Sequence, residues 1–323
     1  MQKNKRLYLH VVCTSLICIV FGFNSVSAEV LNLNLAIQNA QSACSGISDA
    51  MSDLKKMAGI NTAVTAVGTV AGGVALGTGI AKKNVDQEQQ ELKEKVARLV
   101  AAKKDVPIEQ LTIADEKTFI QQIQGTIRGL SDETNQDIVR IEELERKSKT
   151  LGHIRTGTLA TNTATNVAGT LIASTNKVDG DLKSKISNCI SAVKDLTNAK
   201  LAAKVEGTAT ETDLTRVDKI VAHCRDWEVV DLESINKRAT GAAISSGVGI
   251  GTGVVGTITS AVANTDATRK GDEQKEKNLN TTANVMAGVS TVASATATVF
   301  NAIQISAIKK AAIVADECEG ALR

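Results

Sequence analysis

The chain is poor in proline, aromatic rings and histidine. Its 323 residues include one proline, one tryptophan, one tyrosine, four phenylalanines and three histidines. Few prolines and rings argue against a β-sandwich or β-barrel, and the chain's helix-compatible composition favours long helices. Base-stacking platforms and aromatic pockets for small molecules need rings that are scarce here. We therefore expect neither a nucleic-acid partner nor a small-molecule substrate.

The first 28 residues have the pattern of an export signal. Basic residues near the start precede the apolar run 11–21, and Ala28 supplies the small residue of a cleavage site. Cleavage would make Glu29 the first residue of the mature protein. The apolar run is short for a membrane span, so an uncleaved anchor or a lipoprotein is the lesser alternative. We expect an exported protein, located in the periplasm or cell envelope of a bacterium, membrane-associated or secreted.

Removal of this leader changes the charge and the aromatic content. The leader holds three basic residues and no acidic one, so the net charge falls from +2 to −1. Three rings remain in the predicted mature chain, Phe119, Phe300 and Trp227. A nearly neutral chain has no general attraction for nucleic acid, which agrees with the scarcity of rings.

Residues with catalytic or metal-binding chemistry are few. After the leader, His153 and His223 are the remaining histidines, and neither has a second cysteine or histidine at metal-ligand spacing. The chain lacks Cys-x-x-Cys, Gly-x-Ser-x-Gly, His-Glu-x-x-His and the phosphate-binding P-loop. We expect no enzyme activity, no metal and no cofactor.

Four long stretches carry no charged residue. They consist mainly of Ala, Gly, Val, Thr, Ser and Asn, and they alternate with charged segments whose apolar residues recur at helical spacing. Each is long enough to cross a bilayer, although the Thr, Ser and Asn make the hydropathy borderline. The four stretches are 57–81, 156–176, 240–265 and 278–308.

Glycines are concentrated in two of these stretches. A glycine inside a helix costs about 1 kcal/mol relative to alanine, so close packing must compensate for several of them. Pairs spaced four residues apart place small residues on one helix face, where two backbones can approach as in membrane helix pairs. The helix-packing positions predicted for this glycine zipper are Gly68, Gly72, Gly73, Gly77, Gly247, Gly249, Gly251 and Gly253.

Four cysteines follow the leader: Cys44, Cys189, Cys224 and Cys318. An even number in an exported protein predicts two disulfides, with three connectivities. An antiparallel helical hairpin closed at its base has its turn midway between its two cysteines. The favoured pairing joins Cys44 to Cys189 and Cys224 to Cys318, whereas an alternative joins Cys189 to Cys224 and Cys44 to Cys318.

The midpoints between the favoured partners fall on turn signals. Midway between Cys224 and Cys318 is Gly271, which lies within a charged run. The midpoint of the other pair, at 116–117, lies in the charged segment between Pro107 and Gly125. Both positions are the best turn candidates in their halves of the chain.

These patterns predict an all-α protein of two long antiparallel helical hairpins. The hairpins are coiled-coil-like and packed through alanine and glycine, either separately or as an extended four-helix bundle. Residues 29–206 form the first hairpin, with a protruding charged tip at about 105–131, and residues 207–323 form the second, with a turn near residue 271.

Two functions agree with this architecture. The leading hypothesis is an exported, non-enzymatic structural or interaction protein of the bacterial cell envelope, which acts through helix packing with a protein partner or with itself. The alternative is a membrane-inserting or pore-forming helical protein whose glycine-zipper hairpins assemble in the bilayer. The two differ in whether the uncharged stretches contact protein or lipid.

Overall fold

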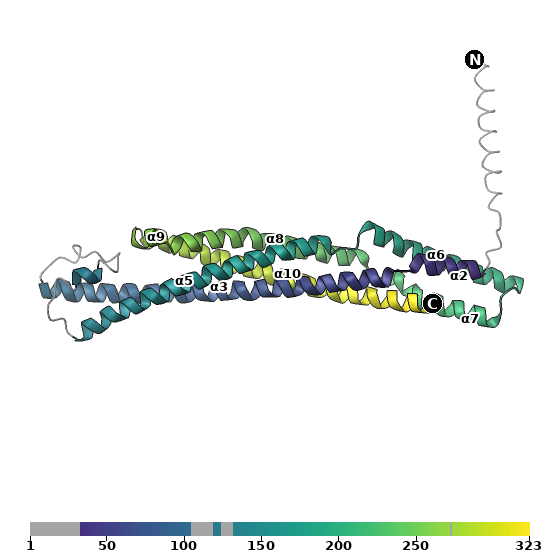
Figure 1. The fold of residues 1–323 in the computed structure, drawn as a ribbon, viewed down its shortest axis with the longest axis horizontal. Coiled ribbons are helices and arrows are strands. Elements are labelled where there is room, and N and C mark those ends of the chain that lie inside the picture. Colours follow the sequence, from purple (N-terminus) through teal and green to yellow (C-terminus); the bar gives the residue numbers. More distant parts are fainter. Residues whose placement is uncertain (1–32, 105–118, 124–131, 272) are drawn as a thin grey trace, which may run out of the picture. The chain divides into compact units, whose positions relative to one another are not determined.

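The computed structural model describes residues 33–104, 119–123, 132–271 and 273–323. Within these residues the chain is helical, with short connections and no strand, so the all-α prediction is confirmed (Figure 1). The expected leader 1–28 and most of the expected charged tip lie outside the described residues. The helices are α2 (Leu33–Cys44), α3 (Ile47–Lys104), α5 (Asp132–Thr175), α6 (Gly180–Glu206), α7 (Glu211–Cys224), η2 (Arg225–Val229), α8 (Leu232–Ala263), α9 (Asp266–Gly271) and α10 (Glu273–Leu322).

The helices form two compact units, and each unit takes segments from both halves of the chain. Unit 1 contains the described residues up to Ser48 together with 181–229 and 313–323, whereas unit 2 contains 49–180 and 230–312. Both expected hairpins therefore contribute helices to each unit. Between α8 and α10, the short helix α9 occupies the region in which the second turn was expected.

Unit 1 has an apolar core. Its α2, α6 and α7, the 3-10 helix η2 and the end of α10 bury aliphatic side chains and the single tryptophan. Charged side chains lie outside, as in the ion pair between Lys194 and Glu228. This distribution is that of amphipathic helices packed in water. The apolar residues buried here include Ile37, Ile47, Ile186, Leu196, Val217, Ile220 and Trp227.

Local signals define the helix ends in unit 1. Gly207, with φ of +67°, follows the end of α6 in the left-handed conformation that glycine adopts without strain. At the start of α7, the Thr210 hydroxyl accepts a hydrogen bond from the Asp213 backbone N–H, and the Asp213 carboxylate accepts from the Thr210 backbone N–H. The hydrogen bonds from Thr210 lower the pKa of Asp213 below its ordinary value.

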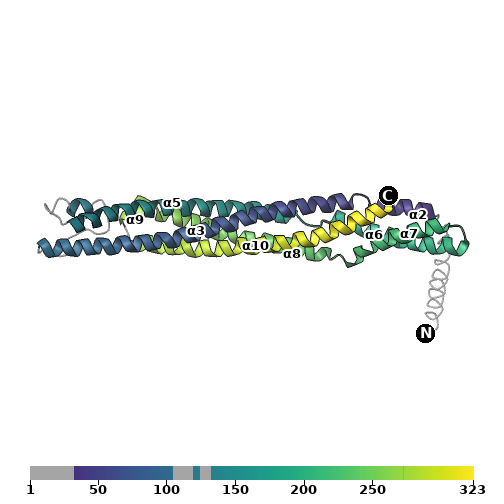
Figure 2. The same ribbon diagram turned by 90° about the horizontal axis from the view of Figure 1, so that it is seen from below.

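Unit 2 is built mainly from α3, α5, α8 and α10, which run side by side in both views (Figures 1 and 2). Lys82 of α3 pairs with Glu276 of α10 at 3.0 Å. The Arg155 Nε of α5 donates to the Ser260 Oγ of α8 at 2.9 Å. These polar links between segments far apart in sequence hold the four helices in register.

One end of unit 2 also has an ordinary apolar core. We call residues 85–102, 119–123 and 132–148 the charged end. Its interior contains Val96, Phe119 and Ile141, each 0% exposed. Its surface carries ion pairs, including Arg140 with Glu88. Hydrogen bonds to Asp137 and then Glu133 raise the pKa of the exposed Lys95.

Candidate functional site: a polar interior beneath an apolar surface

The four uncharged stretches lie together in unit 2, and we refer to them as the belt. It comprises 57–81 on α3, 156–176 on and just after α5, 240–265 on and just after α8, and 278–308 on α10. Its interior is occupied mainly by alanine, glycine and uncharged polar side chains. The buried polar residues are Asn61, Thr65, Asn162, Asn166, Asn176, Ser246, Ser260, Ser290, Ser294, Asn301 and Gln304.

The outer surface of the belt is rich in apolar side chains, with threonine and serine among its smaller exposed residues. Its exposed large side chains are nearly all branched aliphatics, and Val70 is 68% exposed and Val292 66% exposed. On α3, every exposed belt residue is alanine, glycine, valine, isoleucine or methionine. The exposed large apolar residues are Met57, Ile60, Val67, Val70, Val74, Ile80, Val167, Leu171, Ile244, Val248, Val254, Val255, Ile258, Val262, Val285, Val289, Val292, Val299 and Ile303.

A groove on this surface is also apolar. It has a volume of about 550 Å³ and lies between α8 and α10. Val248 lines it from α8, and Val285, Val289 and Val292 line it from α10. The apolar character therefore continues into the space between these two helices.

Charged groups enter the interior at one border of the belt, next to the charged end. The Lys82 side chain is 1% exposed, and its Nζ pairs with Asp86 at 2.6 Å and with Glu276 at 3.0 Å. Asp86 also accepts a hydrogen bond from the Ser148 hydroxyl at 2.5 Å. A buried ammonium group needs such partners, because an unpaired charge in the interior is strongly destabilising.

Arg155, which is fully buried, continues this polar cluster. Its guanidinium donates to Asn280 Oδ1 at 2.6 Å and to Asn284 Oδ1 at 3.1 Å, as well as to Ser260. These three acceptors are neutral oxygens on α8 and α10. The side chains of Lys82, Asp86, Arg155, Ser260, Glu276, Asn280 and Asn284 together form what we call the polar clamp, which joins all four helices of the belt.

The middle of the belt contains a network of neutral side chains. Asn162 Nδ2 donates to Ser290 Oγ, and Asn166 Nδ2 donates to Asn162 Oδ1, both at 2.9 Å. The Ser294 hydroxyl lies 2.8 Å from Asn162 Oδ1 and 3.0 Å from Asn166 Oδ1, and the two oxygens share its single proton. Ser290 Oγ donates to the Gly249 carbonyl, which brings α8 into the same network.

A third polar layer lies near the opposite border of the belt. Asn61 Nδ2 donates to Asn301 Oδ1 at 2.9 Å, and Asn301 Nδ2 donates to Thr65 Oγ1 at 3.3 Å. Gln304 Nε2 donates to the Asn176 carbonyl at 2.9 Å. Polar side chains thus follow the interior from one border to the other, interrupted by an apolar cluster that includes Leu159.

Of the eight glycines predicted to pack helices, four lie at close interhelical contacts. A Cβ atom on Gly68 would lie 2.5 Å from Thr165 Oγ1, and one on Gly249 would lie 2.5 Å from Asn166 Nδ2. Gly72 faces Thr291 in the same way, and Gly253 faces Thr163. Each of these glycines makes room for a polar side chain of a neighbouring helix.

The other four predicted glycines lie on the exposed side of their helices. For Gly73, Gly77, Gly247 and Gly251, nothing lies within 4 Å of the position that a Cβ would occupy. Spacing alone therefore did not separate the inward from the outward glycines.

Five further glycines make close contacts that the spacing did not single out, among them Gly241, which meets the ring of Phe300. Gly79 meets Asn284, Gly152 meets Asn264, and Gly169 meets Thr65 and Ser246. Gly256 contacts Met286 and Leu159. Most of these glycines face a short polar residue from a distant part of the sequence. The sequence could identify them only if the register between the helices were already known.

Both disulfides lie in unit 1. Cys44 of α2 bonds Cys189 of α6, and Cys224 at the end of α7 bonds Cys318 of α10. The structure therefore has the pairing that the midpoints favoured. The sulfurs of Cys44, Cys189 and Cys318 all lie within 4.8 Å of one another, so the two disulfides are neighbours.

This proximity predicts disulfide exchange in Cys224→Ser. The Cys318 thiolate in this variant attacks a sulfur of the neighbouring disulfide, forms a new S–S bond and releases Cys44 or Cys189 as a thiolate. We expect a non-reducing peptide map at mildly alkaline pH to contain Cys318 joined to Cys44 or Cys189. Cys318→Ser is the control, because the Cys224 sulfur is outside the set within 4.8 Å. A Cys44–Cys189 bond retained in full by both variants would contradict the expected exchange.

The two histidines considered in the sequence belong to different units. His153 is exposed on α5 of unit 2. His223 Nδ1 lies 4.0 Å from a carboxylate oxygen of Glu317 on the surface of unit 1. The structure does not bring them into one site within the described residues.

Three helical stretches of the described chain are long and apolar enough to cross a membrane: Leu33–Ala102, Leu232–Ala263 and Gln274–Leu322. No protein-family model, curated protein or solved structure matches this chain. Its functional residues therefore have to be identified from its own chemistry, and the belt is the feature that most needs an explanation.

Proposed function

We propose that this protein is exported and that its belt inserts into a lipid bilayer as a four-helix unit. It would act as a non-enzymatic, membrane-embedded structural protein of the bacterial envelope. The observation that carries the proposal is the reversed burial in the belt, where polar side chains are inside and branched aliphatic side chains are outside.

The same chain provides an internal comparison. At the charged end, Phe119 and Ile141 are buried and Arg140 is at the surface, as expected for helices in water. The belt reverses this arrangement without a break in α3. This many exposed large apolar side chains on one part of the chain are unfavourable in water and mark a surface that contacts lipid or another protein.

The length of the belt agrees with a bilayer. The 25 uncharged residues of α3 span about 37 Å at the helical rise, and the 21 residues 156–176 span about 32 Å. A hydrocarbon core is about 30 Å thick, and the bilayer with its headgroups is about 40–45 Å thick. On α3 and α5, the first charged residues therefore come where the headgroup region would begin.

The interior contacts are those of helices associating in lipid. Without a strong hydrophobic driving force between helices, association in a bilayer depends on close packing of small residues and on interhelical hydrogen bonds. The contact of Gly249 with Asn166 and the bonds among Asn162, Ser290 and Ser294 supply both.

Helix α5 explains why the belt would have to insert as an assembled unit. It is absent from the three stretches that are apolar enough to cross a membrane alone. It contributes Asn162 and Asn166 to the interior, and it carries the buried Arg155 directly before its belt segment. These groups are costly in lipid unless the other three helices satisfy them.

A charge placed on the outer surface of the belt tests the proposal. Val292 lies near the middle of the belt on α10 and is 66% exposed, so Val292→Asp would place a carboxylate in the hydrocarbon at a cost of about 3 kcal/mol. We expect the unaltered chain to stay with membranes during high-pH carbonate extraction and to be released by detergent. We expect Val292→Asp combined with Val248→Asp to be recovered largely in the carbonate supernatant.

Val139→Asp is the matched control for this experiment. Val139 is also an exposed valine, 54% exposed on α5, but it lies in the charged end. Its substitution should leave membrane retention unchanged. Release of the unaltered chain by carbonate would overturn membrane insertion and favour a protein partner, or a second copy of the chain, on the belt.

A further inference from the structure

We infer that one border of the belt binds the headgroups of anionic lipids. The inference rests on the proposed insertion of the belt and adds a lipid preference to it. The border in question lies opposite the polar clamp, and its basic residues come from α3, α8, α10 and the segment that follows α5. We call these residues the basic border: Lys55, Lys56, Lys177, Lys237, Arg238, Lys309 and Lys310.

Hydrogen bonds place the four segments of the basic border at one level. Gln304 of α10 donates to the Asn176 carbonyl, just before Lys177. Asn236 of α8 exchanges two hydrogen bonds with the backbone of Val178, just after it. With its amide group oriented to satisfy both partners, Asn176 also bonds the Leu54 carbonyl, directly before Lys55 of α3, at 3.1 Å.

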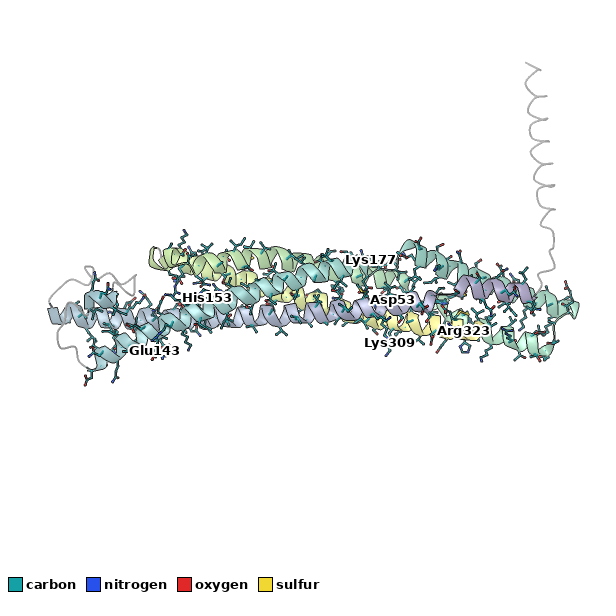
Figure 3. All side chains as sticks on the ribbon, viewed as in Figure 1. Asp53, Glu143, His153, Lys177, Lys309 and Arg323 are labelled. Atoms are coloured by element: carbon teal, nitrogen blue, oxygen red, sulfur yellow. A yellow bond between two sulfur atoms is a disulfide. The ribbon has the colours of Figure 1, made fainter. Side chains whose placement is uncertain are left out.

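The α10 segment is tied to the same level. Arg238 Nη1 donates to the Ile303 carbonyl at 3.2 Å, and Lys309 and Lys310 follow within two helical turns. Lys177 and Lys309 lie at the same end of unit 2, together with Asp53, and Glu143 lies toward its other end (Figure 3). The basic border therefore surrounds one end of the belt.

The charge of this border is positive. Its seven basic residues are accompanied by four acidic residues in the same segments, Asp53, Asp179, Asp231 and Glu233. Asp53 pairs with Lys56, and Glu233 pairs with Lys237, at the surface. Outside these two ion pairs the border has five basic side chains, Lys55, Lys177, Arg238, Lys309 and Lys310, against Asp179 and Asp231, so its net charge is +3.

On two of the four helices, the opposite border uses its first charged side chains differently. On α3 and α5 these are Lys82 and Arg155, which are buried and bonded inside the polar clamp. On the basic border, Lys55, Lys309 and Lys310 are exposed. Outward lysines next to an apolar belt are placed for lipid phosphates, since their stems lie along apolar surface while the ammonium groups reach the headgroups.

Vesicle flotation of the full, disulfide-bonded chain tests the inference. The probes are phosphatidylcholine vesicles and phosphatidylcholine vesicles containing phosphatidylglycerol. Because the attraction adds up over several basic residues near a negative surface, we expect at least about tenfold tighter binding to the anionic vesicles at low salt. The preference should weaken as the salt concentration rises.

A fourfold variant removes four positive charges and changes the net charge of the basic border from +3 to −1: Lys55→Gln, Lys177→Gln, Lys309→Gln and Lys310→Gln. It should bind both kinds of vesicle equally, at the level at which the unaltered chain binds phosphatidylcholine. The control carries the same change in net charge at exposed lysines of unit 1: Lys183→Gln, Lys185→Gln, Lys204→Gln and Lys219→Gln. It should keep the preference for anionic vesicles.

The outcomes separate this inference from the proposed function. Equal binding of the unaltered chain to both kinds of vesicle would overturn the lipid preference and leave insertion standing. If the fourfold variant kept the preference for anionic vesicles, the basic border would not be its source. The same conclusion would follow if the control variant lost the preference to the same degree. Failure of the unaltered chain to bind either vesicle would instead count against the insertion of the belt.

Discussion

Gly249→Leu is expected to lower the free energy of unfolding by about 3 kcal/mol or more, because a buried side chain would be forced into a packed interface. A Cβ at this position would lie 2.5–2.9 Å from the side-chain atoms of Asn166. Asn166 cannot move away without losing its bonds to Asn162 and Ser294. The same substitution at Gly251, on the exposed side of α8, should be tolerated.

Gly249→Leu and Gly251→Leu can be compared directly, because both place the same residue on the same helix. Leucine is a better helix former than glycine at both sites, by up to about 1 kcal/mol. Any larger difference therefore reflects interhelical packing. Thermal unfolding of the three proteins, followed by circular dichroism in one detergent or buffer, measures it. Similar losses at Gly249 and Gly251 would contradict the packing described for α8.

Lys82→Met is expected to lower the free energy of unfolding by about 3 kcal/mol, because it removes one partner from a buried charge cluster. Asp86 and Glu276 would then face each other's charge without the ammonium group that now lies within 3.0 Å of both. The loss of stability should lie at the lower end of the range for broken buried ion pairs, since both carboxylates retain some exposure to solvent. Denaturant unfolding of the variant measures the loss.

Two further variants test the cause of this loss. Lys83→Met removes the neighbouring lysine, which is exposed, and should change the free energy of unfolding by no more than about 0.5 kcal/mol. Lys82→Met combined with Asp86→Asn and Glu276→Gln should recover much of the loss, because no unpaired charge remains. A triple variant no more stable than Lys82→Met would show that the lysine acts through its packing rather than through its charge.

Several features of the fold were accessible from the sequence because they depend on local chemistry. Helical spacing and the scarcity of proline and aromatic residues predicted an all-α protein, and the described residues contain no strand. The midpoint argument favoured the pairing of Cys44 with Cys189 that the structure contains. The turn of a helical hairpin lies midway along the chain between the bases of its arms. The number of residues between two cysteines and a turn therefore indicates which cysteines can pair.

The sequence did not show which face of each glycine-rich helix packs against a neighbouring helix. Gly249 and Gly251 belong to overlapping four-residue spacings, yet one packs against Asn166 and the other is exposed. Residues two positions apart point to different sides of a helix, and the spacing is the same for either side. The neighbouring helix decides which glycine is used, and Asn166 is distant in the sequence.

By itself, the sequence determined the helices, the charge-free length of the belt and the positions of its charged borders, since composition and local spacing set all three. The tertiary structure decided that the asparagines and serines face inward while the valines face outward. That choice depends on the register of four helices, because a polar group such as Arg155 is satisfied only where Ser260, Asn280 and Asn284 come together. The buried polar groups require this register, and the same register leaves the valines on the outer surface.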